Sequence, residues 1–325
     1  MTVLDPLPLR HEKVLERGMT TFKKYADSTL DEWKYIGTKS NVRLYSRKPE
    51  IPNTPMIYRG DYHFAADPTM IEYVRPVDLS SAFMFHSVRK VVDERTGALE
   101  VRVIRSRYSQ ISYAQTNPYW IIAARDFSQV NKREVSDDAV YYGSFSMVDD
   151  ELNPPVAGFV RGHIDCSGIK VSRDTSGDGG WMLSMVVQAD IGGSIPTMVT
   201  HRAIQTLPLI TQAYGDYFSQ FGFPPTATLP EDSIEFLGEN FDHEKATYTL
   251  HVGASKGTKK GVEVACCQRM FPEGFDVEVQ GDAVYTVDET SKKPHSVVLI
   301  NRLQGSVTVL IVGKYKLSPH LKKSK

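Results

Sequence analysis

The segment that decides the fold is SIPTMVTHRAIQTLPLITQAYGDYFSQF, residues Ser194–Phe221. Ser194 can cap a helix and Pro196 suits its first turn, so a long helix is predicted to begin here. Pro208 lies inside the segment and predicts a kink, because proline cannot donate the backbone hydrogen bond that a helix requires. The apolar side chains recur at steps of three and four along one face: Val199, Ala203, Leu207, Ile210, Tyr214, Tyr217 and Phe221.

The chain before this helix alternates in the way that β-strands do. An N-terminal helix is predicted over about Arg10–Asp31, and a short helix over Asp67–Val74, where Asp67-Pro68 supplies a cap and a first-turn proline. Strands are predicted over Val42–Arg47, Met56–Gly60, Phe85–Val92, Leu99–Tyr113, Arg125–Val135, Ala139–Val148, Val156–Ile164, Ile169–Arg173 and Trp181–Asp190. The most economical arrangement is an α+β fold, in which a curved antiparallel sheet wraps around the long C-terminal helix.

A second domain is predicted after the segment Gly222–Thr226, which is rich in glycine and proline. Short strand-like runs separated by turn residues follow, which is typical of a small all-β sandwich. We therefore divide the chain into residues 1–226 and a β-sandwich domain of residues 227–325. The last ten residues, Lys316–Lys325, form a basic tail, for which a solvated surface and contact with a membrane surface are both open interpretations.

Composition excludes several classes of protein. The net charge of −1 shows none of the excess of lysine and arginine that a general nucleic-acid binder carries. The three cysteines cannot form a disulfide framework, and no spacing of cysteine and histidine matches a metal site. No apolar run is long enough to span a membrane, and the N-terminus lacks the pattern of a signal peptide. The expected location is cytoplasmic, with peripheral association with membranes as an extension of that expectation.

Five motifs in order along residues 33–196 resemble the START domain, the steroidogenic-acute-regulatory-related lipid transfer family. They are Trp33 with Val42–Arg47, Arg125-Asp126-Phe127, Pro154–Gly162, Ser167-Gly168 and Gln188–Pro196. The resemblance covers roughly residues 1–222 and implies a helix-grip fold with a lipid cavity between the sheet and the last helix. Two departures are visible: an aromatic segment replaces the usual lead-in to Arg125, and the C-terminal strands lie outside the family pattern.

The resemblance also implies a site. The residue six places after Arg125 points into the cavity in the family pattern, and here it is Asn131, with Ser87 near a partner position. A neutral amide and a hydroxyl suit a hydroxyl or amide group of a lipid better than a bare phosphate. The residues expected to contact lipid are Ser87, Phe127, Gln129, Asn131, Tyr142, Ile164, Met185, Val199, Ala203 and Leu207.

A gate is expected where the family has a loop beside the last helix. A structural role is expected for the charged residues of the Arg125-Asp126-Phe127 motif and for Arg161. The gate residues are Tyr119, Trp120, Ile195 and Met198, with the alternative that the cluster around Trp120 belongs to the core. A buried arginine or carboxylate is tolerated when paired, so a structural role is predicted for Arg125, Asp126 and Arg161.

The sequence contains few features that are typical of an enzyme. No nucleophile elbow, phosphate-binding loop or dinucleotide fingerprint is present, and the histidines His86, His163 and His201 are separated from one another. We predict no catalytic residue, cofactor or metal, and a non-enzymatic protein that binds and transfers a sterol, phospholipid or ceramide-like lipid. Two alternatives stay open: a lipid sensor that recruits a protein partner through residues 227–325, and a cyclase-like enzyme of the helix-grip superfamily.

Overall fold

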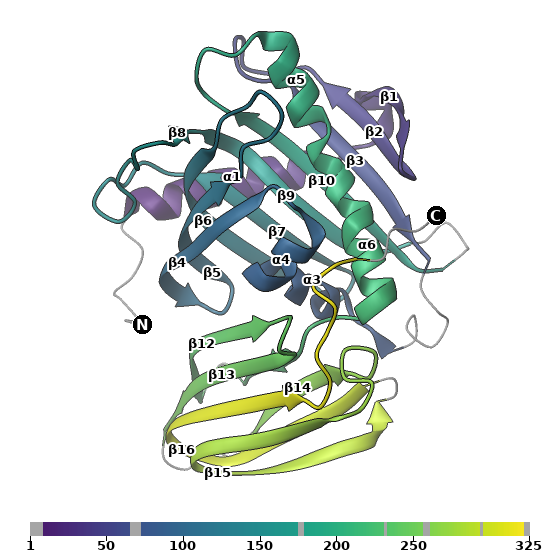
Figure 1. The fold of residues 1–325 in the computed structure, drawn as a ribbon, viewed down its shortest axis with the longest axis vertical. Helices are drawn as coiled ribbons and strands as arrows, with labels where there is room; N and C mark the ends of the chain where they lie inside the picture. Colours follow the sequence, from purple (N-terminus) through teal and green to yellow (C-terminus); the bar gives the residue numbers. More distant parts are fainter. Residues whose placement is uncertain are drawn as a thin grey trace. The chain divides into compact units, whose positions relative to one another are not determined.

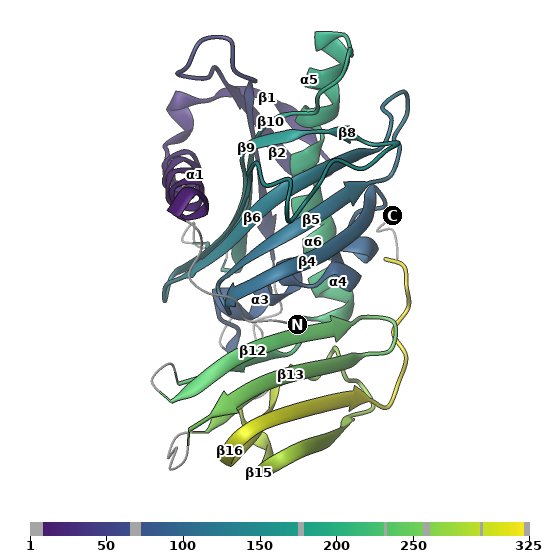
Figure 2. The same cartoon turned by 90° about the vertical axis from the view of Figure 1, so that its left-hand side faces the viewer.

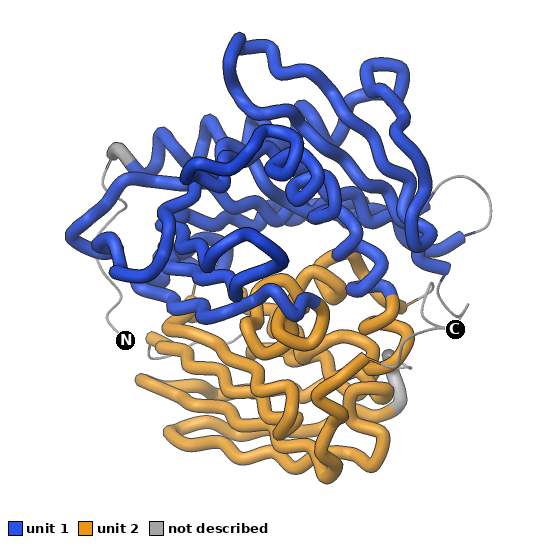
Figure 3. The backbone as a smooth tube through the Cα atoms, turned by 45° about the horizontal axis from the view of Figure 1, so that its top comes forward, with its two compact units in different colours: residues 1–65, 93–215 blue, residues 66–92, 216–325 orange. Residues whose placement is uncertain are grey.

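The structure is a computed structural model that describes residues 9–65, 73–174, 179–230, 233–255, 261–292 and 295–321. It divides into two compact units (Figure 3). The first comprises residues 1–65 and 93–215, and the second comprises residues 66–92 and 216–325. This division places residues 66–92 and 216–226 with the C-terminal strands, whereas the sequence predicted a division after residue 226. Independent folding of residues 1–226 stays a prediction.

The first unit is built on a strongly curved antiparallel sheet (Figures 1 and 2). Its strands follow the order β1-β2-β3-β10-β9-β7-β6-β5-β4, and the short strand β8 pairs in parallel with β6. The strands are β1 Lys34–Lys39, β2 Val42–Arg47, β3 Ile57–Phe64, β4 Thr96–Ser106, β5 Ser109–Thr116, β6 Arg125–Val135, β7 Ala139–Ser146, β8 Val160–Arg161, β9 His163–Arg173 and β10 Trp181–Asp190.

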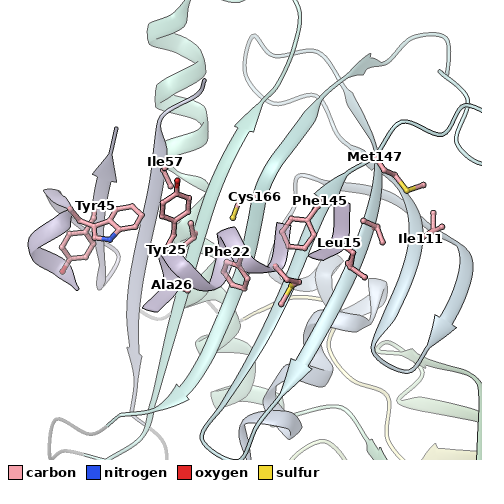
Figure 4. Close-up of a cluster of buried hydrophobic side chains, with 14 of the residues drawn as sticks. Leu15, Phe22, Tyr25, Ala26, Tyr45, Ile57, Ile111, Phe145, Met147 and Cys166 are labelled. Atoms are coloured by element: carbon pink, nitrogen blue, oxygen red, sulfur yellow. The ribbon is translucent and has the colours of Figure 1, made fainter. Parts of the chain in front are cut away.

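Helix α1, Leu9–Asp27, covers one face of this sheet, and the short 3-10 helix η1, Leu30–Glu32, follows it. A buried apolar cluster that includes Phe22 and Phe145 lies between α1 and the sheet (Figure 4). The contact is close because Gly18 has no side chain: a Cβ atom there would lie 2.3 Å from the Phe145 ring. Val130 of β6, Cys166 of β9 and Val186 of β10 belong to the same cluster.

The predicted long helix covers the opposite face of the sheet. It consists of α5, Thr197–Gln205, the 3-10 turn η2, Leu207–Leu209, and α6, Ile210–Phe221. Pro208 lies in the 3-10 turn, so the predicted interruption at this proline is confirmed. The turn packs directly on the sheet at Gly60 of β3, where a Cβ atom would lie 2.5 Å from Cβ of Pro208. A sheet that grips a C-terminal helix is the predicted architecture, and it is confirmed.

The second unit contains the helices α3, Pro76–Met84, and α4, His86–Val92, and a six-stranded antiparallel sheet. Its strands are β11 Thr226–Thr228, β12 Ile234–Asp242, β13 Thr247–Ala254, β14 Val262–Cys267, β15 Phe275–Lys292 and β16 His295–Gly313. The long strand β16 pairs with β14 through residues 295–300 and with β13 through residues 305–312, and β15 pairs along it. Phe85 packs against Phe241 and Tyr248 and so joins the helices to this sheet.

Three predicted strands are wrong. The single predicted strand Leu99–Tyr113 is a hairpin of β4 and β5, which turns at residues 107–108. In the predicted strand Phe85–Val92, residues 86–92 form helix α4, in which Val88 and Val92 are buried at the four-residue spacing of a helix. In the predicted strand Val156–Ile164, residues 156–159 form an irregular loop after two prolines, with Gly158 at a φ of +89°; the rest divides between β8 and the start of β9. The predicted helix Asp67–Val74 lies mostly outside the described residues.

Candidate functional site

A row of uncharged polar side chains crosses the face of the sheet that α5 covers. Val130 faces α1, so by the two-residue period of a strand Asn131 faces the other side. Asn131 is only 2% exposed. Its Oδ1 accepts a hydrogen bond from Ser112 Oγ of β5 at 2.6 Å, and its Nδ2 donates one to Ser144 Oγ of β7 at 2.7 Å. The row therefore links three adjacent strands.

Two glutamine side chains extend this row. Gln110 lies opposite Asn131 in the register of β5 and β6, and Gln129 lies opposite Ser112. Both glutamines are buried, and Gln110 Nε2 has no hydrogen-bond partner among the described residues. Because a buried amide N–H without a partner is costly, this donor calls for an acceptor such as a water molecule or a ligand oxygen. The five residues Gln110, Ser112, Gln129, Asn131 and Ser144 are called the polar row below.

One cation stands on the same face, two positions after Asn131. Arg133 is buried, and its guanidinium carbon lies 5.6 Å from the centre of the Tyr108 ring. Such stacking stabilises a guanidinium group that is withdrawn from water. The polar row is therefore uncharged along its length, and the Arg133 guanidinium lies two positions beyond Asn131 on β6.

The other residues predicted to contact lipid have different positions. Tyr142 and Met185 are buried and share the face of the polar row, since Phe145 and Val186 face α1. Phe127 is half-buried on β6, and its ring lies against Gly162. The helix residues are half-buried on α5 and η2: Val199, Ala203 and Leu207.

Two residues predicted to contact lipid, Ser87 and Ile164, lie away from the polar row. Ser87 was placed on a strand, but it is in α4, and its hydroxyl donates a hydrogen bond to the carbonyl of Phe241 within the second unit. Ile164 borders a pocket of about 310 Å³ that α1 forms with the ends of β7 and β9. Neither observation joins these two side chains to the polar row.

Two of the three predicted scaffold residues, Asp126 and Arg161, pair with each other, and Arg125 binds backbone carbonyls. Arg161 forms two parallel hydrogen bonds to the buried Asp126 carboxylate, at 3.1 and 2.9 Å. This hydrogen bonding raises the pKa of the Arg161 guanidinium. Arg125 instead donates to three carbonyls, those of Ala123, Ile191 and Gly192, at 2.6, 2.9 and 3.2 Å. Burial without a carboxylate partner lowers the pKa of Arg125.

The predicted gate segment is exposed and turns tightly. Tyr119 and Ile122 exchange two backbone hydrogen bonds, so Trp120 and Ile121 form a two-residue loop. Trp120 is 68% exposed and has a φ of +55°, a left-handed conformation that is uncommon for a bulky residue. Met198 at the start of α5 is 80% exposed, and Ile195 is half-buried. Through Ala123, Ile191 and Gly192, Arg125 ties the base of the Trp120 loop to the segment that leads into α5.

Among the described residues, a histidine and carboxylate pair of the kind used in catalysis is formed by His163 and Asp165. His163 Nε2 lies 3.5 Å from Asp165 Oδ1 on β9, and this contact raises the pKa of a histidine that is half-exposed. The described residues contain no group of three histidine, cysteine, aspartate or glutamate side chains that could hold a metal ion. Within the same residues, no helix has both the length and the apolar character of a membrane span.

Comparison with known proteins agrees with the architecture. Residues 69–208 match the model of the START domain family. Human StAR-related lipid transfer protein 5 has a similar structure with a TM-score of 0.51 and 20% identity, covering 64% of this chain and 96% of that chain. Human STARD10 has a TM-score of 0.50 and 15% identity, covering 62% of this chain and 79% of that chain. No curated protein matches this chain in sequence.

Two independent observations, the family match and the helix-grip fold, therefore agree on a START-like fold. The resemblance that the motifs indicated is confirmed: the chain carries a START domain match over residues 69–208 and a START-like sheet and C-terminal helix. Sequence reasoning missed Gln110, Ser112 and Ser144, which complete the polar row. Their only signal was alternation of small polar residues with Ile111 and Phe145 along two strands.

Proposed function

We propose that this protein binds a lipid between the sheet and the last helix of its START-like unit and transfers it between membranes without changing it chemically. The observation that carries the proposal is the START family match over residues 69–208, which brings the fold and the lipid-transfer class together. The name of the structural neighbour StAR-related lipid transfer protein 5 supports the same class.

The polar row supports a particular kind of ligand. A lipid buries its apolar body through the hydrophobic effect, while a few polar groups fix its orientation. Asn131 and its neighbours carry no charge, and Gln110 offers a free N–H donor. We therefore assign a lipid with an uncharged hydrogen-bond acceptor, such as a hydroxyl or an amide carbonyl, as the preferred ligand. A lipid with an anionic head group is the contrasting ligand in the experiment.

The exposed loop supports transient contact with a membrane surface. Trp120 and Ile121 project from the tip of the loop, and Met198 is exposed at the start of α5. Aromatic and aliphatic side chains favour the interface of a bilayer. Because Arg125 connects the base of this loop to the residues before α5, insertion of the loop would act on the segment that leads into the helix. This is the proposed gate.

A transfer assay with the full chain tests the proposal. Donor vesicles carry one fluorescent lipid at a time: a ceramide, a sterol, phosphatidylcholine or phosphatidic acid. The expected result is faster transfer of a lipid with an uncharged head than of phosphatidic acid, with every lipid recovered unchanged after long incubation. Transfer at the rate of a protein-free control for all four lipids would contradict lipid transfer. Recovery of a chemically altered lipid would support the cyclase-like alternative instead.

A further inference from the structure

The last sheet of the chain ends in a long open edge. Strand β15, Phe275–Lys292, pairs with β16 and with no other strand among the described residues. A strand at an edge presents unpaired backbone N–H and C=O groups that can receive a further strand. Most residues between Asp276 and Glu289 are exposed or half-buried, so the edge is open to solvent.

Apolar side chains of β15 continue the buried face of the sheet to its edge, where they remain partly exposed to solvent. Val277 and Val279 lie opposite Ile311 and Val309 of β16, which are fully buried. Farther along, Tyr285 and Val287 lie opposite Ile300 and Val298, which are also fully buried. Tyr285 is nevertheless 44% exposed and Val287 is 39% exposed. One more strand beside β15 would cover them, since neighbours across a strand pair share a face.

The charge of the edge restricts what can occupy it. Strand β15 carries five carboxylates, Asp276, Glu278, Asp282, Asp288 and Glu289, against one basic residue, Lys292. Lys314 pairs with Asp276 at 3.3 Å, in a contact that leaves the Asp276 side chain 76% exposed. Pairing with β15 of a second copy would bring acidic strands together, and like charges across a strand pair destabilise it.

The backbone also restricts the length of the added strand. Gly281 has a φ of +113°, and the register between β15 and β16 shifts on both sides of Asp282. These bulges divide the edge into Phe275–Gln280 and Val284–Asp288, each of which has the length of an ordinary strand. Bulges and charged side chains are features that keep an edge strand from pairing with the same strand of a second copy. They leave it open to a short strand of opposite charge.

We propose that the edge of β15 binds an extended segment of a partner protein, in which β-branched apolar residues alternate with lysine or arginine. The apolar residues cover Tyr285 and Val287 on one face, and the basic residues face the carboxylates of the strand. The backbone of the segment adds a strand to the sheet. This interaction is independent of lipid binding in the first unit.

The test uses a labelled peptide, acetyl-Lys-Val-Lys-Val-Lys-Val-Lys-amide, and fluorescence anisotropy with the full chain. Val287→Lys should weaken binding about fivefold or more, because it removes an apolar cross-strand contact and adds a like charge. Val135→Lys is the matched control, since Val135 is a similarly exposed strand valine of the first unit and should have no effect. If Val287→Lys does not fold, Asp276→Asn combined with Glu278→Gln should weaken binding without touching the core.

Backbone pairing is tested with N-methylated peptides of the same sequence. Methylation of alternate nitrogens along one edge should abolish binding, and methylation along the other edge should leave it intact, because a strand pairs through one edge at a time. Hydrogen exchange of residues 284–288 should slow when the peptide binds. Equal binding of both methylated peptides would reduce the contact to charge attraction and overturn the proposal. A dimer of the chain that competes with the peptide would also overturn it, by assigning the edge to a second copy.

Discussion

Substitution of Asn131 by leucine tests whether the polar row is an integral hydrogen-bonded unit. The change removes the acceptor of Ser112 Oγ and the donor to Ser144 Oγ, and both serines are buried. Each hydroxyl left without a partner costs roughly 1–3 kcal/mol. The leucine recovers part of this by burying apolar surface, so we expect a net loss of about 2 kcal/mol in the free energy of unfolding.

The matched control replaces the three linked members of the row at once, in Ser112→Ala/Asn131→Leu/Ser144→Ala. Since no hydroxyl is then left unpaired, the triple variant should be more stable than Asn131→Leu, with a loss below about 1 kcal/mol. Urea denaturation at equilibrium, followed by circular dichroism, measures both. A triple variant that is less stable than the single variant would show that the unpaired hydroxyls do not cause the loss of stability. The triple variant also serves the lipid assay: it should fold but bind a lipid with a hydroxyl or amide head several-fold more weakly.

Four further predictions follow from the same contacts. Trp120→Ala should leave the melting temperature unchanged, because the side chain is exposed, but should slow lipid transfer between vesicles; a large drop in melting temperature would mean that Trp120 packs in the core. Gly60→Ala should destabilise the protein by about 1–3 kcal/mol in a denaturation experiment, since the new Cβ meets Pro208 and Val42, whereas Gly253→Ala, where the nearest atom is a flexible carboxylate, should not. A fragment of residues 1–226 should bind lipid but melt below the full chain, because Phe85 loses Phe241 and Tyr248; equal melting temperatures would show that these contacts add nothing. Stability should fall as the pH drops below about 6.5, because burial lowers the pKa of His243 in the folded state and the unfolded chain takes up the proton first; His243→Gln should reduce this slope in pH-dependent melting.

His243 is buried between two hydrogen-bond partners, Tyr217 and Ser318. Its Nε2 donates to the carbonyl of Ser318 at 2.9 Å, so Nδ1, at 3.0 Å from the Tyr217 hydroxyl, accepts from it. A proton on Nδ1 would turn this acceptor into a second donor and break the arrangement. Burial favours the neutral form and lowers the pKa of His243, and it outweighs the hydrogen bond to Ser318, which acts in the opposite direction.

The strands with strict alternation could be predicted from the sequence to the residue. Arg125–Val135 and Trp181–Asp190 agree with β6 and β10, because each is long and lies between clear turn signals. The break at Pro208 was equally predictable, since it follows from the covalent structure of proline. Helix α4 was not, because Val88, Val91 and Val92 favour a strand locally and only burial against the second sheet makes them helical.

The sequence predicts short strands after residue 226, whereas β15 and β16 are long. Gly281 and Gly305 resemble turns in the sequence, but both have positive φ angles inside long strands, at or beside shifts in register. A bulge and a turn use the same residue, and only pairing with a distant strand distinguishes them. In the site, the family pattern pointed to Asn131, whereas Ser112 and Ser144 became visible only through the register of β5, β6 and β7.

Native mass spectrometry of the purified full chain tests the central proposal most directly. We expect a population heavier than the protein by the mass of one lipid. Collisional activation should release that lipid, and extraction should recover it with an uncharged head group and no chemical change. The triple variant of the polar row should carry less of it, while Val287→Lys should carry the same amount as the unaltered protein. A chain that shows no bound lipid, and that takes up none when incubated with vesicles of each of the four lipids, would contradict the account.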